Sequence, residues 1–508
     1  MKSMGKMIFL SLLIIGIKGF GGAIPDPRPF VLSIDTNNTG TSTNLQFKIP
    51  TKKDLTYNYD VDCENDGSYE FTNQTGDVLC VYNKSGIKTI RIRGTFPAIY
   101  FDNTGDTQKV LDVLQWGDIV WESMANAFKG ASNLTISASD NPYLVQVLSM
   151  RYMFKGATQL TFTYSINDWD VSHVTSMYGL FDLAENFNSD ISGWEVLNVT
   201  TMAYMFSQAK QFNQTLGKWN VSQVQDMSSM FYGAEMFNQK IGDWNTSQVR
   251  KMSHMFHYAL TFNQSIVKWD VSNVDGSNNG MYYMFANATD FNQDIGDWDV
   301  SQVENMGAMF YQASSFNQDI SEWNVSQVRN MQWMFNQAHT ISIAHYDNLL
   351  RKWNTLNLQN DVTFHAGVTS FYCQSEAERL AIENNYRWGF DDAGLNCDFY
   401  IITPDEVTVK SGETFVINVN ANIDEGDGTY HTIVGGTDAD KFTMNAYGVL
   451  QFKVAPDVHL PADQNGDNIY RVLVRAEDNG PEDFQTIKVK VVADSNPALV
   501  PVIMYLLN

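Results

Sequence analysis

The sequence lacks the spacings that most catalytic and metal centres need. Its four cysteines form no C-x-x-C pair, so a zinc site is not expected. It contains no H-E-x-x-H sequence and no G-x-S-x-G turn. His254 and His257 are three residues apart, but they occupy variable positions of the repeats described below, which is typical of exposed surface. The sequence therefore predicts a protein that is not an enzyme.

Basic residues are also scarce. The 33 Lys and Arg residues are outnumbered by 57 Asp and Glu residues, which gives a net charge of −24. A nucleic-acid partner is not expected, because binding phosphates requires a basic surface. An acidic surface is compatible with calcium, which takes carboxylate oxygens, but charge of either sign also simply keeps a protein soluble.

No apolar run is long enough to cross a membrane. Residues 8–17 and 498–507 are each ten residues long, whereas a spanning helix needs about 20. Lys2 and Lys6 precede the first run, and the small residues Gly21, Gly22 and Ala23 follow it. Residues 1–23 therefore have the pattern of a secretory signal peptide, and we expect an extracellular or cell-surface protein with no transmembrane span.

The cysteines fall in two separate regions. Cys63 and Cys80 are 17 residues apart, and Cys373 and Cys397 are 24 apart, so local pairing is the simplest of three connectivities. Two disulfides would require an oxidising compartment, in agreement with export. Four free thiols are the alternative.

A unit of 25 residues repeats through the middle of the chain. Its clearest copy, residues 219–241, has the sequence WNVSQVQDMSSMFYGAEMFNQKI. A Trp, a Met-Phe step and a Phe-Asn step recur in phase, with one insertion of four residues near 275–279. The Trp positions are Trp169, Trp194, Trp219, Trp244, Trp269, Trp298 and Trp323. Such a period predicts a solenoid, because a single unit cannot bury its own apolar face.

Within a unit, apolar residues at spacings of three and four predict a helix of about three turns over residues 221–234. The alternation over residues 237–241 predicts a short strand. We expect Met, Phe and Trp to form the core; an exposed Trp strip for binding is the alternative. The Asn after each Phe is expected to satisfy backbone groups of the next unit.

Runs typical of β-strands flank the repeats, and they predict two β-sandwiches. The expected strands are residues 30–34, 45–49, 56–61, 77–82, 89–93, 406–409, 415–419, 449–452, 470–474 and 486–492. The predicted fold class is therefore α+β and multidomain. The predicted order is a signal peptide (1–23), a β-sandwich (24–98), the repeat solenoid (99–345), a disulfide-closed cap (346–398), a second β-sandwich (399–496) and a tail (497–508).

The repeated sequence W-D/N-V-S-x-V-x-x-M-x-x-M-F-x-x-A-x-x-F-N-Q resembles the repeats of BspA-like leucine-rich-repeat surface proteins. Residues 61–67 (VDCENDG) are similar to the front domain of such proteins, and residues 372–397 to their cysteine-closed cap. The resemblance implies a leucine-rich-repeat-like solenoid. It also implies a secreted or surface-exposed bacterial protein, often an adhesin.

Residues 436–442 (GTDADKF), 448–452 (GVLQF) and 470–480 (YRVLVRAEDNG) resemble a bacterial cadherin-like repeat. Cadherin-type domains bind calcium between carboxylates at domain junctions. The resemblance therefore implies calcium ligands at Asp478, Asp494 and Asn496, with Asp438 and Asp440 as further candidates.

Two other acidic loops could hold calcium. Asp62, Glu64, Asp66 and Gly67 follow the spacing at the start of a calcium loop, but Asn73 stands where an EF-hand needs a bidentate Glu. An EF-hand is therefore not expected, and a weak metal site is the alternative to a solvated turn. For residues 463–467 we expect a solvated turn.

Together these features predict a secreted or cell-surface adhesion and recognition protein. The solenoid would be a rigid binding scaffold, and calcium would stiffen the cadherin-like end. The expected partner is a surface protein or glycan of another cell, or a second copy of the chain. Alternatives are a carbohydrate-binding accessory protein, which exposed rows of Trp would favour, and a structural surface-layer component.

Overall fold

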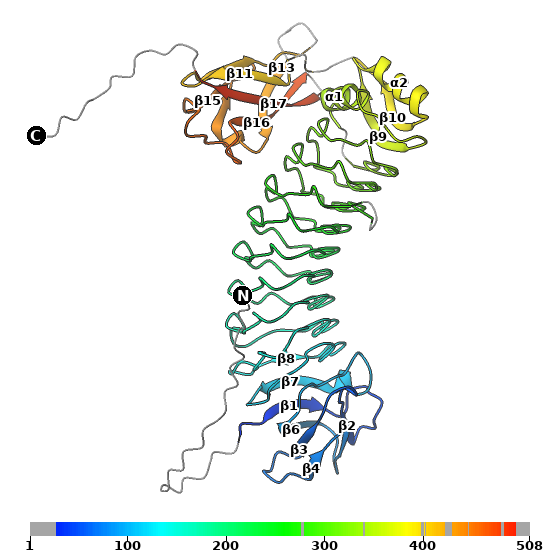
Figure 1. Ribbon diagram of the computed structural model, residues 1–508, viewed down its shortest axis with the longest axis vertical. Helices are drawn as coiled ribbons and strands as arrows, with labels where there is room; N and C mark the ends of the chain where they lie inside the picture. Colours follow the sequence, from blue (N-terminus) through cyan, green and yellow to red (C-terminus); the bar gives the residue numbers. More distant parts are fainter. Residues whose placement is uncertain are drawn as a thin grey trace, which may run out of the picture.

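A computed structural model describes residues 27–275, 279–338, 341–397, 401, 403–421, 429–445, 447–478 and 482–493. The chain is elongated: a long stack of turns has a β-domain at its N-terminal end and a small helical cap at its other end (Figure 1). A second β-domain lies beside the cap and the last turns (Figure 1). The predicted signal peptide and tail lie outside the described residues.

The described part of the chain is mostly β-structure. Its two α-helices are α1 (Ile343–Trp353) and α2 (Glu376–Tyr386), and neither is long and apolar enough to cross a membrane. The N-terminal strands are β1 (Phe30–Asp35), β2 (Gln46–Ile49), β3 (Asn58–Asp62), β4 (Phe71–Gln74), β5 (Val78–Val81), β6 (Ile87–Thr95), β7 (Val110–Gln115) and β8 (Thr135–Ile136). The C-terminal strands are β9 (Thr363–Tyr372), β10 (Gly389–Leu395), β11 (Glu406–Lys410), β12 (Phe415–Asn418), β13 (Thr429–Gly435), β14 (Phe442–Met444), β15 (Val449–Phe452), β16 (Ile469–Asp478) and β17 (Glu482–Val492).

The N-terminal sheet closes one end of the stack. Its strand order is β4-β3-β6-β1-β7-β8, and β2 and β5 form a separate pair. Buried and half-buried residues alternate along β1, as expected for a strand with one face on a core. β7 pairs in parallel with β8, and Ile136 of β8 bridges in parallel to Phe162. The sheet thus extends beyond the expected boundary at residue 98 and continues into the repeats.

The predicted helix and strand in each unit are wrong, and with them the α+β class and the leucine-rich-repeat-like solenoid. Residues 221–241 contain turns and neither a helix nor a strand. Ser229 and Gly233 have φ angles of 55° and 65°, which no right-handed helix permits. The same left-handed conformation recurs two residues before and two residues after each conserved Phe from Phe128 to Phe335. The apolar residues at spacings of three and four, which suggested a helix, instead lie at the inward-facing corners of consecutive turns.

Backbone hydrogen bonds join each unit to the next. The N–H groups of Met227, Ser229, Phe231 and Gly233 donate to carbonyls 24 residues further on, over 2.7–3.0 Å. The N–H groups between them close turns, as Met230 does onto Met227 at 3.1 Å. The bonds that a helix would form within one unit are therefore made largely between units.

The Phe and Trp columns are core. Phe231 and Phe256 stack with ring centroids 5.6 Å apart, and neighbouring units repeat this contact. Trp219 and Trp244 are 4% and 3% exposed, and each indole N–H donates to a backbone carbonyl 28 residues earlier. The Trp column therefore offers no exposed strip to a sugar, so the observation that would have favoured a carbohydrate-binding accessory protein is missing.

The Asn residues form a second ladder. The side-chain oxygen of Asn213 accepts the backbone N–H of Asn238 at 3.0 Å, and that of Asn238 accepts the N–H of Asn263 at 3.0 Å. This confirms the expectation that each Asn satisfies the next unit. It also explains the missing strand, because the N–H group that a strand would pair is bonded to an amide oxygen.

The ladder ends in the cap, whose disulfide is Cys373–Cys397. Asn317 accepts the N–H of Ser342, and the Ser342 hydroxyl accepts the N–H of His345 and caps α1. One hydrophobic core runs from Phe30 in β1 to Trp388 in the cap. The C-terminal β-domain has a core of its own, between the sheets β11-β17-β16-β13 and β12-β15-β14.

We predict that Asn238→Ala destabilises the protein by about 1–3 kcal/mol, the usual cost of leaving a partly buried donor without its acceptor. Its oxygen accepts from the N–H of Asn263 and from Nε2 of Gln264 at 2.9 Å. The free energy of unfolding in urea measures the loss. Gln223→Ala, an exposed position in the same unit, is the control and is expected to change nothing. Equal stability of the two variants would contradict the ladder.

Candidate functional site

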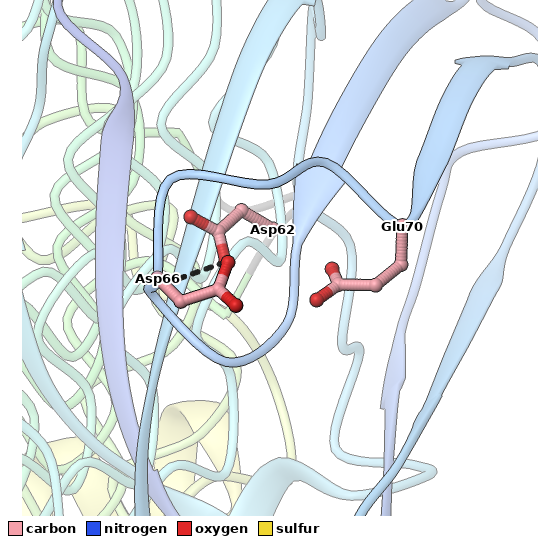
Figure 2. Close-up of side chains that lie close together, drawn as sticks. All are labelled: Asp62, Asp66 and Glu70. Carbon is pink, nitrogen blue, oxygen red and sulfur yellow. Dashed lines mark hydrogen bonds between the residues drawn. The ribbon is translucent and has the colours of Figure 1, made fainter.

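An acidic loop lies at the edge of the N-terminal sheet. Asp62 ends β3, and the loop returns to β4 through Asp66 and Glu70. Carboxylate oxygens of these three residues lie within 4.8 Å of one another, and Figure 2 shows them converging across the loop. Among the described residues this is the one group of three carboxylate, imidazole or thiol side chains close enough to share an ion. The spacing of Asp62 and Asp66 signalled the loop, but Glu70 was missed and Glu64 is not in the group.

Of the residues predicted to bind calcium, the structure describes the side chains of Asp438 and Asp440 only. Asp438 is buried, and its oxygens accept N–H groups of Gln464 at 2.7 Å and of Arg471 at 2.9 Å. Asp440 is exposed and pairs with Lys441 at 2.9 Å. Asp478 ends β16, but its side chain is not described, and Asp494 and Asn496 lie outside the described residues.

The last repeats differ from the others where they meet the C-terminal β-domain. The position three residues after the Phe of each Phe-Asn step is Asp190, Thr215, Lys240 and Ser265 in earlier units, and Asp294 and Asp319 in the last two. Both of these last aspartates are buried. Asp190 at the same position is exposed, so an aspartate of this row is buried where the second domain covers it.

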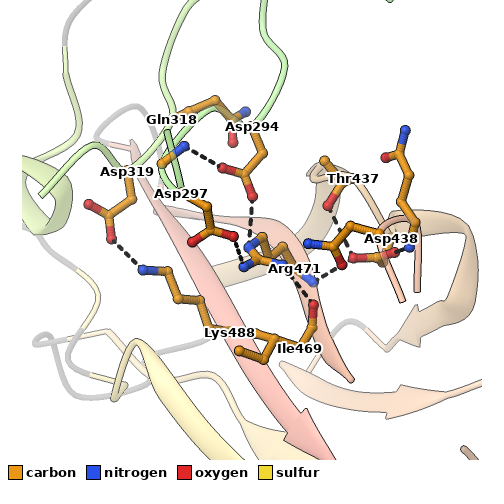
Figure 3. Close-up of polar contacts among 12 residues, drawn as sticks. Asp294, Asp297, Gln318, Asp319, Thr437, Asp438, Ile469, Arg471 and Lys488 are labelled. Atoms are coloured by element: carbon orange, nitrogen blue, oxygen red, sulfur yellow. Dashed lines mark hydrogen bonds and ion pairs between the residues drawn. The ribbon is translucent and has the colours of Figure 1, made fainter. Parts of the chain in front are cut away.

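Arg471 of β16 and Lys488 of β17 face the two buried aspartates (Figure 3). Arg471 is 3% exposed; its Nε lies 3.1 Å from Asp294, and its Nη2 contacts Asp297. The Lys488 ammonium lies 3.9 Å from Asp319. Burial raises the pKa of Asp294 to about 6, although the nearby Arg471 favours the charged form. Buried charges of opposite sign therefore fix the domain in one register.

A second contact between the stack and the C-terminal β-domain is a hydrogen bond between neutral groups. The imidazole of His345 in α1 accepts the Thr486 N–H at Nε2, over 2.8 Å. Its other nitrogen lies 3.2 Å from the Asn317 oxygen, which places the proton on Nδ1. Burial lowers the pKa of His345, so the neutral ring that this geometry needs is the stable form. The Asn ladder is thereby connected through His345 to β17.

Asp483 of β17 completes the junction. It is buried, and its two oxygens accept the N–H groups of Ile343 at 3.2 Å and Ile401 at 2.8 Å. Burial raises its pKa to about 7, against the effect of these backbone hydrogen bonds.

Three clefts follow the seam between the stack and the C-terminal domain. Their volumes are about 730, 390 and 380 Å³. Both signs of charge line the largest: Asp297, Glu322 and Glu406 face Arg471 and Lys490. The lining contains no Ser, Cys or His nucleophile pair, so it has the character of a polar seam between domains.

An aromatic edge runs along the stack, at the turns on either side of the Phe of each Met-Phe step. We define it by Tyr152, Tyr178, Tyr204, Tyr232, His254, His257, Tyr258, Tyr283, Tyr311 and Trp333. Several neighbouring rings are in contact, with centroids 5.2 Å apart for Tyr152–Tyr178 and 5.1 Å for His254–Tyr283. Tyr204 is 37% and Trp333 46% exposed.

Several of these residues occupy a strained backbone position. Tyr152, Tyr204, His254, Tyr283 and Trp333 have φ between 56° and 59°, where a residue other than glycine costs roughly 1–2 kcal/mol. Gly179 holds the same place in another unit with φ 59°, so glycine fits there. The ring contacts of these side chains offset part of this strain, and strain of this kind clusters at binding sites.

The histidines of the edge are not the exposed pair that the sequence predicted. His257 is buried, and its Nδ1 lies 3.0 Å from that of His254. Burial and the neighbouring His254 lower the pKa of His257 to about 4. The pair is neutral at pH 7 and packs with the tyrosines.

Comparison with known proteins gives one family match. A family model described as "Mycoplasma protein of unknown function, DUF285" matches residues 122–244, 208–280, 235–348 and 277–377. BspA-like repeat proteins are in this group, so the coarser part of the expected resemblance is confirmed. No curated protein matches the sequence.

Solved structures add little. A crystal structure of Drosophila N-cadherin EC1-3 is 18% identical over 20% of this chain and 37% of its own, with a TM-score of 0.16. The EC1-4 structure is 21% identical over 21% and 27%, with a TM-score of 0.15. The chain thus spans about a third of these fragments, and scores this low do not confirm a cadherin-like domain.

We predict that Arg471→Met destabilises the C-terminal domain by about 3–5 kcal/mol, because Asp294 is left buried without its charge partner. Urea unfolding measures the loss. Lys490→Met, on the neighbouring strand and with an exposed side chain, is the matched control. Adding Asp294→Asn to Arg471→Met is expected to recover part of the stability; no recovery would contradict the pairing.

We also predict that the stability of this domain falls as pH rises from about 4 to 7. Asp483 and Asp294 hold their protons in the folded state to about pH 7 and 6, whereas the unfolded chain releases them near 3.8. The folded state therefore binds more protons within this window, so their contribution is full below pH 4 and lost by pH 7. Asp483→Asn should reduce the slope of unfolding free energy against pH; an unchanged slope would refute the assignment.

Proposed function

The chain belongs to the family described as Mycoplasma protein of unknown function, DUF285, and from this membership we propose that it is a non-catalytic recognition protein of a cell surface. Its partner is a glycan or protein on another cell. The BspA-like proteins of this group support the surface location, as do the disulfides Cys63–Cys80 and Cys373–Cys397, which need an oxidising compartment.

The observation that carries the proposal is the aromatic edge. Tyr and Trp supply much of the binding energy at protein interfaces, because they bury a large area at low cost in conformational entropy. Tyr204 and Trp333 project from left-handed turns of a stack whose backbone is fixed on both sides by hydrogen bonds. A partner that binds the edge would meet side chains already held in place.

Calcium at the C-terminal domain is not part of this proposal. The oxygens of Asp438 are taken by backbone N–H groups, and Asp440 has Lys441 as its partner. The C-terminal domain instead acts by covering the end of the stack, where it fixes the last repeats through Arg471 and Lys488.

We predict that Tyr204→Gly combined with Trp333→Gly abolishes adhesion and leaves the fold intact. Each lost aromatic anchor costs about 2 kcal/mol or more of binding. Stability stays within about 1 kcal/mol of the wild type, because glycine relieves the left-handed strain while ring contacts are lost. Beads coated with the full secreted chain are scored for attachment to cultured epithelial cells and to one another, and urea unfolding is measured in parallel.

Ser229→Gly is the matched control, since it changes the same backbone position where no aromatic ring is present. It is expected to leave attachment unchanged. Attachment of the double variant at the wild-type level would remove the aromatic edge as the binding face. Wild-type beads that attach to nothing would overturn the proposed function itself, and clumping of beads alone would make the partner a second copy.

A further inference from the structure

Positive charge gathers at one end of the aromatic edge. The ammonium groups of Lys129 and Lys155 and the guanidinium of Arg151 lie 4.6–5.3 Å from the ring centres of Tyr152 and Tyr178. The other cation–ring contacts of the described residues lie in the N-terminal β-domain and the cap. A chain with a net charge of −24 therefore places three cations against two rings of its aromatic edge.

Two of these three cations already have carboxylate partners. Lys129 lies 2.7 Å from a carboxylate oxygen of Asp102, and Lys155 lies 2.6 Å from one of Asp182. Asp182 is buried, so its negative charge needs Lys155 to remain beside it. The two lysines therefore leave no unpaired charge for a ligand.

Arg151 is the cation without a carboxylate. It is exposed, and its guanidinium makes no ion pair or hydrogen bond among the described residues. Its central carbon lies 4.9 Å from the ring centre of Tyr152 and 4.6 Å from that of Tyr178. Contacts of this kind hold a guanidinium in place but give none of its five N–H donors an oxygen acceptor. Arg151 is therefore a positioned set of donors that lacks an anion.

The row of rings continues beyond Arg151 into the next unit. Ring centres are 5.2 Å apart for Tyr152–Tyr178 and 5.5 Å apart for Tyr178–Tyr204, and Tyr204 is 37% exposed. A tyrosine offers an apolar ring face with a hydroxyl at its tip, which suits a ligand such as a sugar that has both apolar and hydroxyl surfaces. A group able to bind an anion and a row of aromatic rings thus lie side by side.

We propose that Arg151, Tyr178 and Tyr204 bind a terminal sugar that carries one carboxylate, of the sialic acid class. The inference rests on the proposed function and names the chemistry of its partner. The guanidinium would bind the carboxylate through two parallel N–H···O bonds, the geometry that arginine favours. The sugar ring would lie on the two tyrosines.

The balance of charge favours a single carboxylate over a polyanion. Arg151 is one unpaired cation, and it neutralises one negative charge. A glycan with many sulfate or uronate groups would bring its remaining charges close to a protein of net charge −24, which repels them. A terminal sialic acid presents one carboxylate at the end of an otherwise neutral chain, so it matches the charge that Arg151 offers.

Ligand-observed NMR titration of the full secreted chain tests the proposal, with a trisaccharide of sialic acid on lactose as the probe. We expect saturable binding, and at least tenfold weaker binding of lactose, which lacks the carboxylate. Arg151→Met should weaken binding of the trisaccharide at least tenfold, because two charge-assisted hydrogen bonds are lost. Arg250→Met removes another exposed arginine of the stack, which has no ring contact among the described residues, and should change the affinity less than twofold.

Two further readings separate a lost contact from a lost fold. Arg151→Lys keeps the charge but not the planar fork, so it should bind the trisaccharide more weakly than the wild type and more tightly than Arg151→Met. Both variants should keep the wild-type midpoint in urea, because the Arg151 side chain is exposed.

Four results would each overturn the proposal. The wild type would give no saturable binding, lactose would bind as well as the trisaccharide, Arg250→Met would lose as much affinity as Arg151→Met, or a sulfated heparin tetrasaccharide would bind more tightly than the trisaccharide.

Attachment of coated beads to epithelial cells separates this inference from the proposed function. We expect both Arg151→Met and treatment of the cells with a sialidase to reduce attachment. Attachment at the wild-type level after both changes would show that the edge binds another partner, so this inference would be wrong while the proposed function stands. Wild-type beads that attach to no cell would overturn the proposed function, whatever the trisaccharide does.

Discussion

The structure depends on hydrogen bonds that leave one unit and end on the next. Donors such as Phe231 and Gly233 reach carbonyls 24 residues on, and Asn238 receives the N–H of Asn263. Within a unit, only turn-closing bonds such as Met230 to Met227 are made, and the alternate donors need the next unit, so a single unit has no stable form alone. The same bonds hold the turns in left-handed conformations, and the turns in turn fix the side chains of the aromatic edge. Hydrogen bonding between successive units therefore keeps the repeats in order and exposes the aromatic edge. It also requires that both ends of the stack be closed.

Much of the fold could be predicted from local patterns. The expected strands coincide within a few residues with β1, β2, β3, β5, β6, β11, β12, β15, β16 and β17. The strands β4, β7, β8, β9, β10, β13 and β14 were missed. Of these, β4, β8 and β14 have only two to four residues, which carry too little alternation to stand out. The Phe, Trp and Asn columns were assigned correctly. The helix failed because Met227, Met230 and Phe231 have the spacing of a helix face, while the φ of Ser229, invisible in the sequence, breaks it.

The sites were predicted less well, for reasons of distance along the chain. Arg471 and Asp297 are 174 residues apart in the sequence. The local sequence around either residue does not indicate that the other is its partner. The change from Lys240 and Ser265 to Asp294 at one repeat position was no clear signal, since Asp190 holds that position in an early unit. Asp438, for which calcium binding stays a prediction, accepts the backbone N–H of Arg471. The acidic loop was recognised by spacing, but Glu70 joins it only because β4 turns back beside β3.

Far-ultraviolet circular dichroism of the full secreted chain tests the central claim most directly, because helical and turn-based units of the same sequence differ in it completely. The described residues contain two α-helices of 11 residues each, so the account predicts a weak helical band within a spectrum dominated by β-structure and turns. Three helical turns in every unit would instead give a strong helical band. That result would contradict the left-handed turns, and with them the ladder and the edge they support.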